Sequence, residues 1–247
     1  MADRGKVRVE ENAKRVRALL GGDVVADSSN TLLVWEVPYY PTYYFPAADV
    51  ATDLLVETGE IVRSPSRGEA AQYVVKTGRA EGAAYSFHDS KIPEISGYYA
   101  FPWKTMDHWF EEDEEVYVHA RDPYTRLDIL PSSRRVRIEI DGVTVADTTN
   151  ASFLFETGLP TRHYIPKVDV QMDLLTPTAT ASACPYKGTA RYWTVNIDGT
   201  DYEDIVWGYD TPLRESQGIA GLVSFYNEKV DTYIDEVLQE RPKAKFS

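Results

Sequence analysis

The chain has 247 residues, which is enough for one large domain or two small ones, and its hydrophobic fraction of 43% is ordinary for a folded protein. The net charge of −13 argues against sequence-independent nucleic-acid binding and against attachment to anionic membranes, because both need clustered Lys and Arg. We therefore expect neither a nucleic-acid nor a membrane partner. A single cysteine, Cys184, excludes an internal disulfide framework and a cysteine-based zinc cluster.

The location of the protein is suggested by two features of the sequence. The first residues, MADRGKVRVEENAKRVR, contain no apolar core of the kind that export signals carry. No stretch of the sequence approaches the ~18 apolar residues that a membrane-spanning helix needs. Together these features predict a cytoplasmic protein.

The expected elements are mostly short strands joined by tight turns. Helical periodicity is limited to two short pieces, Asn12–Leu20 and Thr211–Ala220. Alternating apolar residues precede Asp141–Gly142, and Gly21–Gly22 occupies the matching place in the first half, so we expect a hairpin at each. Another pair of strands is expected about Asp198–Gly199. The sequence therefore predicts mainly antiparallel β-structure with minor short helices.

A repeat divides the chain into two similar halves. The segment VADSSNTLLVWEVPYYPTYYFPAADV at 25–50 matches VADTTNASFLFETGLPTRHYIPKVDV at 145–170, a spacing of 120 residues. The match continues through SPSRG at 64–68 and CPYKG at 184–188, after which the second copy gains a few residues. Each copy has about 100 residues, which is the size of a domain rather than of a solenoid repeat.

The repeat predicts two homologous domains, each a small antiparallel β-barrel or folded sheet. The expected organisation is an N-terminal extension, a first domain, a connecting segment, a second domain and a tail, at residues 1–14, 15–110, 111–133, 134–236 and 237–247. Two fused copies are similar to a homodimer joined into one chain. We therefore expect an intramolecular pseudo-dimer of the two repeats, related by a pseudo-two-fold axis.

The repeated hairpin carries the first candidate for chemistry. Residues opposite each other in a sheet are in contact, so we expect Glu156 to face His163 or Tyr164. In the first copy Glu36 is expected to face Tyr44 or the tyrosine before it. A carboxylate beside an imidazole fixes its tautomer, which suits a general base. The alternative is an exposed cross-strand pair with no function.

The turn CPYKG carries the second candidate. It contains Lys187, and Arg67 occupies the matching place in the first copy, so a cation is retained in kind. A retained cation favours an anionic ligand such as a carboxylate or phosphate. The alternative is a solvated turn cation. We expect Cys184 to be a small buried thiol, because the first copy has Ser64 there.

Aromatic residues about the later hairpin of the second copy are the third candidate, since they are able to line a pocket for a planar ligand. The alternative is that they form the core of a β-domain. The four histidines have no metal-ligand spacing, so we expect no metal site and no cofactor. The predicted ligand-binding residues are Glu36, Tyr44, Arg67, Tyr164, Tyr192, Trp193, Trp207 and Tyr209.

These motifs resemble the bacterial "domain of unknown function 427" family, which carries a nucleotidyltransferase-like label. The resemblance covers about 15–109 and 135–233, and the second copy is the better match through CPYKG and VWGYDTP. The first copy departs from the family pattern at SPSRG and AYSFHD. The resemblance implies a compact, mainly β domain similar to the folded sheets of the Mss4-like group. It does not imply the zinc of that group, because the cysteine pairs are missing.

The leading functional hypothesis is a tandem-domain protein that binds a small anionic or planar metabolite in a pocket of the second domain. Glu156 and His163 are the expected proton-handling pair in metal-independent acid–base chemistry, and Lys187 is the expected charge stabiliser. One alternative is a structural or interaction module without catalysis. Another is a nucleotidyltransferase-like enzyme, although the sequence lacks the paired G-S and D-x-D motifs of such enzymes.

Overall fold

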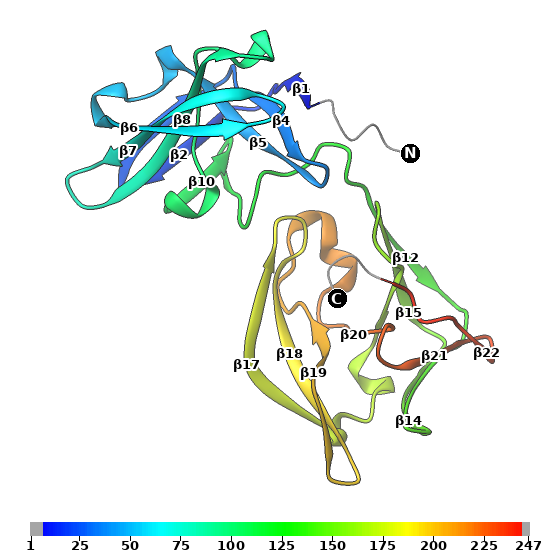
Figure 1. The fold of residues 1–247 in the computed structure, drawn as a ribbon. Coiled ribbons are helices and arrows are strands. Elements are labelled where there is room, and N and C mark those ends of the chain that lie inside the picture. Colours follow the sequence, from blue (N-terminus) through cyan, green and yellow to red (C-terminus); the bar gives the residue numbers. More distant parts are fainter. Residues whose placement is uncertain (1–6, 244–247) are drawn as a thin grey trace. The chain divides into compact units, whose positions relative to one another are not determined.

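Each half of the chain is built from one seven-stranded and one four-stranded antiparallel sheet (Figure 1). The structure is a computed structural model and describes residues 7–243. The halves divide between Asp122 and Pro123, and each forms one domain. Within the described residues no sheet closes into a barrel, so the mainly β prediction is confirmed in its folded-sheet form.

In the first domain the order of the seven-stranded sheet is β1-β4-β5-β9-β8-β7-β6 and that of the four-stranded sheet is β11-β10-β2-β3. The strands are β1 (Arg8–Glu11), β2 (Val16–Leu20), β3 (Asp23–Ser28), β4 (Leu32–Val37), β5 (Tyr40–Pro46), β6 (Leu55–Ser64), β7 (Gly68–Lys76), β8 (Glu81–Ser90), β9 (Tyr98–Ala100), β10 (His108–Glu111) and β11 (Glu114–Glu115). Short 3-10 helices join some of them, namely η1 (Ala47–Asp49), η2 (Thr52–Leu54), η3 (Pro93–Ile95) and η4 (Trp103–Thr105).

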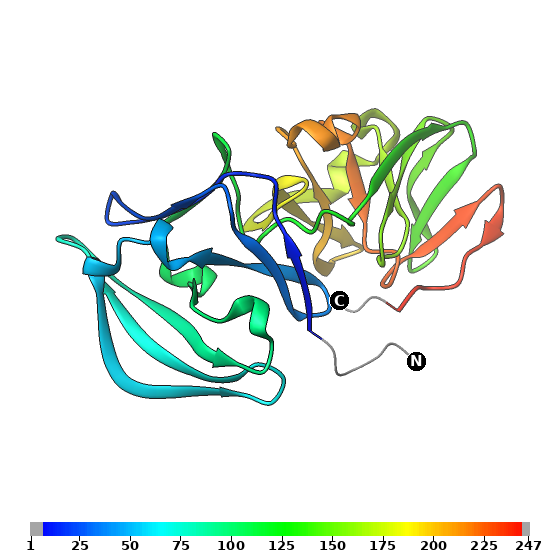
Figure 2. The same cartoon turned by 90° about the horizontal axis from the view of Figure 1, so that it is seen from above.

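The second domain repeats this topology strand for strand, with sheet orders β12-β15-β16-β20-β19-β18-β17 and β14-β13-β21-β22. The strands are β12 (Leu127–Ser132), β13 (Val136–Ile140), β14 (Val143–Thr148), β15 (Ala151–Glu156), β16 (Arg162–Ile165), β17 (Leu175–Cys184), β18 (Gly188–Ile197), β19 (Thr200–Gly208), β20 (Val223–Phe225), β21 (Asp231–Ile234) and β22 (Val237–Leu238). Its 3-10 helices are η5 (Lys167–Asp169), η6 (Met172–Leu174) and η7 (Arg214–Ile219). In Figure 2 the red β21–β22 hairpin lies beside the green strand β13, with which β21 pairs. The shared order confirms the predicted repeat.

Both domains extend beyond the predicted bounds. Strand β1 lies in the expected N-terminal extension and strand β12 in the expected connecting segment, yet each is an edge strand of a seven-stranded sheet. The helix predicted at Asn12–Leu20 is wrong, because Val16, Ala18 and Leu20 of β2 are buried in the alternating pattern of a strand. The segment Thr211–Ala220 does contain a short helix, η7. In the described part of the chain no helix is long and apolar enough to cross a membrane.

The predicted hairpin turns are confirmed. Gly21–Gly22, Asp141–Gly142 and Asp198–Gly199 each join two adjacent strands of one sheet. All six residues have positive φ angles, between 48° and 87°. Two consecutive positive φ values are typical of the type I′ turn, whose twist matches that of the flanking strands.

Two hydrophobic clusters occupy opposite faces of each seven-stranded sheet. In the first domain the larger cluster packs Val16 and Leu20 of the four-stranded sheet against Tyr43 and Phe45 of β5. The smaller cluster lies on the other face and includes Tyr44. Because side chains alternate along a strand, neighbouring residues of β5 enter different clusters. The second domain has the same two clusters.

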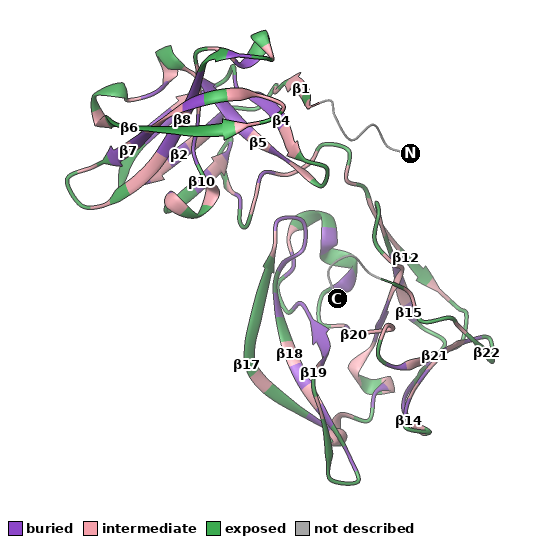
Figure 3. Cartoon of the chain, in the orientation of Figure 1, coloured by how far each residue is buried: buried purple, intermediate pink, exposed green. Residues whose placement is uncertain are grey.

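Strands β6 and β17 form the exposed edges of the two seven-stranded sheets, and Figure 3 shows them almost entirely in the exposed colour. Both edges are irregular at the same place. The register of β6 with β7 shifts between Glu57 and Ile61, and the register of β17 with β18 shifts between Pro177 and Ala181. An extra unpaired stretch of this kind is a β-bulge.

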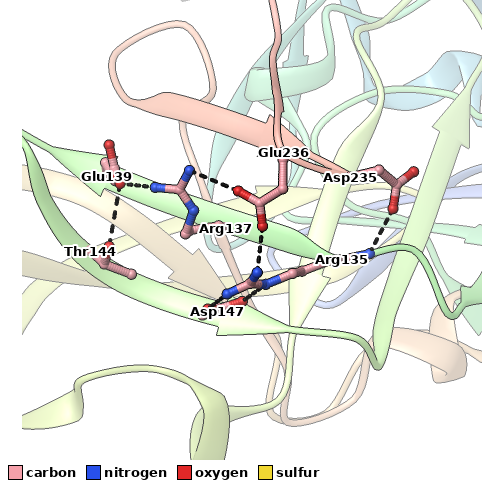
Figure 4. A network of polar contacts seen from close by, with 7 residues as sticks. All are labelled: Arg135, Arg137, Glu139, Thr144, Asp147, Asp235 and Glu236. Carbon is pink, nitrogen blue, oxygen red and sulfur yellow. Dashed lines mark hydrogen bonds and ion pairs between the residues drawn. The ribbon is translucent and has the colours of Figure 1, made fainter.

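A surface ion-pair network covers the four-stranded sheet of the second domain (Figure 4). Arg135 binds Asp147 through two hydrogen bonds, of 2.8 and 2.5 Å, and also pairs with Glu236. The Arg135 guanidinium lowers the pKa of the Asp147 carboxyl. The first domain repeats the pair, with 2.5 Å between Arg15 and Asp27. These groups are accessible to solvent, so each pair contributes little to stability.

The turn at Gly142 generates a prediction about stability. Gly142 has φ of 79°, and a Cβ added there meets no described atom within 4 Å, so Gly142→Ala adds only backbone strain. We expect the free energy of unfolding to fall by about 1–2 kcal/mol, which is the cost of an L-residue in the left-handed region. Equilibrium unfolding in urea, followed by circular dichroism, measures the change.

Gly78→Ala is the matched control. A Cβ at Gly78 also meets nothing within 4 Å, but the φ of this residue lies outside the left-handed region. We expect this variant to be as stable as the parent or up to about 1 kcal/mol more stable, because alanine restricts the unfolded chain. Equal losses in the two variants would show that the turn conformation at Gly142 does not matter.

Candidate functional site

Glu36 is the centre of a polar cluster in the first domain. Its Oε1 atom accepts hydrogen bonds from the hydroxyls of Tyr44 and Tyr85, at 2.7 and 2.6 Å, and pairs with the Arg67 guanidinium at 2.5 Å. Arg67 also donates to the Tyr44 hydroxyl at 2.9 Å. Glu36 therefore contacts Tyr44, although the two are not opposite each other in the hairpin, since Tyr44 pairs with Leu32.

The register of the central strands brings these side chains together. Ala100 of β9 pairs with Tyr44 on one side and with Tyr85 on the other, so the three residues share one face of the sheet. The small alanine separates two phenol rings that meet edge to face, with their centroids 6.1 Å apart. Gly68, at φ of 101°, shapes the β6–β7 turn that presents Arg67 to this face.

The ion pair of the first domain is shielded from solvent, since only 19% of the Glu36 side chain and 16% of the Arg67 side chain are exposed. Burial, and then the Glu36 carboxylate, raise the pKa of Tyr44 well above its usual range, so its phenol stays protonated and donates at neutral pH. The Oε2 atom of Glu36 has no hydrogen-bond partner among the described residues.

The second domain builds a related cluster with different residues. Lys187 pairs with Glu156, as Arg67 pairs with Glu36, and both side chains are about nine-tenths buried. The indole Nε1 of Trp207 donates to the Tyr164 hydroxyl at 3.2 Å. Trp207 stands where the first domain has Tyr85. The predicted Glu156 and Lys187 therefore meet.

The predicted pair of Glu156 and His163 is wrong. His163 lies opposite Phe153, and their rings contact edge to face with centroids 4.6 Å apart. Phe153 belongs to the larger cluster, whereas Tyr164 belongs to the smaller one. His163 and Tyr164 are adjacent in β16, so their side chains point to opposite faces of the sheet. The His163 side chain therefore lies on the face opposite that of Glu156. Tyr164 is the alternative that the sequence left open.

The remaining predicted residues divide between the two faces. Tyr209 and Trp207 belong to the smaller cluster, and Tyr192 packs against it. The Tyr192 hydroxyl shares a hydrogen bond of 2.7 Å with Ser182. Trp193 belongs to the larger cluster, away from the Glu156 face, as expected for a core residue. Cys184 is a free thiol of intermediate exposure.

A cavity of about 370 Å³ opens beside the first-domain cluster. Its polar lining includes Glu36 and Arg67. Its aromatic lining includes Tyr40, which stacks on His119 at 4.0 Å, and Trp103, which stacks on Trp109 at 4.6 Å. Sequence reasoning missed Tyr40, Trp103, Trp109 and His119. The available signal was the difference between the copies, because "FPWKT" of the first is matched by "FYNEK" in the second.

Metal ligands do not gather at either cluster. Over residues 7–243, no group of three or more His, Cys, Asp or Glu side chains is arranged to hold a metal ion.

The two domains coincide with two matches to a known family. The family described as a domain of unknown function (DUF427) matches residues 8–112 and 128–236. The chain belongs to this family. Each DUF427 match begins at or within an outer strand, β1 or β12, and ends before the last short strand, β11 or β22. The family unit therefore includes strands of both sheets of one domain. No curated protein matches the chain significantly.

The buried His163 generates a prediction about pH. Burial, aided by Arg162 and Arg134, lowers the pKa of His163 to about 4. In the unfolded chain this histidine binds a proton below pH ~6.5, whereas in the folded chain it binds one only below about pH 4. The free energy of unfolding therefore falls as the pH decreases from the first value to the second. We expect the titration of His163 to lower the free energy of unfolding by about 3 kcal/mol as the pH decreases from 7 to 4.

His163→Phe isolates this contribution, because phenylalanine fills the site without titrating. The free energy of unfolding of the variant should rise relative to that of the parent by about 3 kcal/mol from pH 7 to pH 4 in urea titrations. His108→Gln is the control, since the His108 side chain is 54% exposed. Parallel pH dependence of the parent and His163→Phe would contradict the assignment.

Proposed function

We propose that this protein binds a planar small molecule in the first-domain cavity, with an N–H or O–H group of the ligand donating to Oε2 of Glu36. The observation that carries the proposal is an unpartnered carboxylate oxygen on a residue that lines an aromatic cavity. A volume of about 370 Å³ lies within the range of small-molecule pockets. Aromatic side chains on its walls favour a flat, unsaturated ligand.

The charges in the cavity favour a neutral ligand. Arg67 is already paired with Glu36, so the guanidinium charge is compensated within the protein. An anionic ligand therefore has to compete with the Glu36 carboxylate for the same cation. This pairing narrows the ligand expected from the sequence, which was anionic or planar, to one that is planar and carries a hydrogen-bond donor.

Binding, rather than acid–base catalysis, is the function that this geometry supports. The proton-handling pair expected from the sequence needs Glu156 and His163 on one face of the sheet, and they lie on opposite faces. In the first domain the phenol of Tyr44 and the guanidinium of Arg67 are engaged with Glu36.

Matched pairs of ligands test the proposed function. Nicotinamide and indole-3-carboxamide carry a donor, whereas nicotinate and indole-3-carboxylate are planar anions of nearly the same shape. We expect the two amides to raise the melting temperature and to quench tryptophan fluorescence, because Trp103 and Trp109 line the cavity. Stronger effects from the two acids would contradict the proposed ligand chemistry. ATP with and without Mg²⁺ tests the nucleotidyltransferase-like alternative in the same assay.

Glu36→Gln should invert this preference. The variant leaves Arg67 without a carboxylate, so it should bind nicotinate more tightly than nicotinamide, the reverse of the parent. It should also lower the free energy of unfolding by about 3–5 kcal/mol, the usual cost of breaking a buried pair. Fluorescence titration with both compounds measures the preference.

Glu228→Gln is the matched control for the inversion, because it removes a second-domain glutamate that also pairs with an arginine, Arg162, and is also shielded from solvent. Its effect on nicotinamide binding to the first-domain cavity should be negligible. An unchanged preference in a folded Glu36→Gln protein, or the same inversion in Glu228→Gln, would refute the site.

A further inference from the structure

The second-domain cluster contains polar groups that lack hydrogen-bond partners among the described residues. The Tyr209 hydroxyl has none, although only 5% of this residue is exposed. The Tyr164 hydroxyl accepts a hydrogen bond from Trp207 but has no acceptor for its own O–H group. Lys187 occupies only Oε2 of Glu156, so Oε1 is unpartnered. None of these three atoms is among the fully enclosed side-chain atoms without a partner in the described residues, so a ligand or ordered water has access to them.

These groups share one face of the seven-stranded sheet. Tyr164 and Trp207 both pair with Ser224 of β20, so their side chains emerge on the same side. Tyr209 lies two residues beyond Trp207 and packs in the same buried cluster as Tyr164. Ser224 is fully buried, and its hydroxyl also lacks a partner.

The first domain satisfies or omits the same hydroxyls. There the Tyr44 hydroxyl donates a hydrogen bond to Glu36, whereas that of Tyr164 donates none to Glu156. Phe87 and Ala100 stand in the places of Tyr209 and Ser224, and neither has a hydroxyl. The unpartnered hydroxyls are therefore a property of the second domain, whereas an unpartnered glutamate oxygen is common to both domains.

We propose that the second domain binds a carboxamide group through Tyr164, Tyr209 and Glu156. The two phenols donate to the carbonyl oxygen of the amide, and Oε1 of Glu156 accepts from its N–H. A carboxamide presents one acceptor and one donor side by side, which is the complement of this set. A carboxylate presents acceptors alone and meets the charge of Glu156, so the site disfavours it.

The protonation of the two phenols agrees with this role. Burial raises the pKa of both Tyr164 and Tyr209 above the usual range, and the Glu156 carboxylate adds to each shift. Both tyrosines are consequently donors at neutral pH. This site is separate from the first-domain cavity and does not depend on the function proposed for it.

Trifluoroacetamide and trifluoroacetate are the probes for this site, observed by fluorine NMR with the full chain. We expect the amide signal to broaden in proportion to the protein added, with little change in the acid signal. Absence of broadening at tens of millimolar amide, or preferential broadening of the acid, would overturn the proposal. In the former case ordered water satisfies these groups.

Tyr209→Phe tests the site without endangering the fold, because it removes a hydroxyl that has no partner among residues 7–243. We expect roughly fivefold weaker binding of trifluoroacetamide, the loss of about one hydrogen bond. Tyr233→Phe is the control tyrosine, since Tyr233 packs under Arg137 on the four-stranded sheet. Unchanged binding in Tyr209→Phe, or an equal loss in Tyr233→Phe, would overturn the proposal.

Glu36→Gln separates this inference from the function proposed for the first domain. Amide binding that is lost in Tyr209→Phe and retained in Glu36→Gln supports the second-domain site. Amide binding that is lost only in Glu36→Gln overturns it and assigns the probe to the first-domain cavity.

Discussion

The alternation of side chains between the two faces of the seven-stranded sheet governs the rest of each domain. One face must bury apolar residues against the four-stranded sheet, and this requirement fixes the register of every strand between them. The other face has only a smaller cluster to support, so it tolerates charged groups such as Glu36 and Glu156. The polar clusters therefore lie on the face that packing constrains less.

A buried ion pair is a weak source of stability, because the desolvation of both charges offsets most of their attraction. Removing one partner nonetheless leaves a buried charge unpaired, which lowers the free energy of unfolding. Each glutamate therefore keeps a cationic partner, Arg67 in the first domain and Lys187 in the second. The aromatic neighbour then determines what else the cluster can bind. A tyrosine such as Tyr85 donates to the carboxylate, whereas the indole of Trp207 has only an N–H and occupies the oxygen of Tyr164 instead.

The hairpins could be predicted from sequence because each depends on residues close together in the chain. The repeat and the cation at Lys187 could be predicted because the two copies can be compared position by position. The register across the 151–165 hairpin could not. The connection between β4 and β5 spans only Pro38 and Tyr39, whereas that between β15 and β16 runs from 157 to 161. Counting from the shorter turn does not determine which residue of the longer hairpin faces Glu156, and an error of one residue exchanges His163 for Tyr164.

The aromatic wall of the first-domain cavity was beyond prediction for a different reason. Tyr40 comes from a hairpin, Trp103 from a 3-10 helix and His119 from the segment expected to join the domains. Only the completed sheet brings these distant segments together. The error at Asn12–Leu20 has a local cause, since apolar residues at 16, 18, 19 and 20 fit the period of a helix as well as that of a strand.

The bulges in β6 and β17 have a consequence for a chain that contains the same domain twice. Tethering holds two matching sheet edges at an effective concentration that free molecules rarely reach. A straight edge invites pairing with its counterpart, and homologous neighbours in one chain are prone to such misassembly during synthesis. Interrupting both ladders at the same position makes each edge a poor template for the other. We therefore expect the irregularity to protect the folding of a duplicated protein, whatever the domains bind.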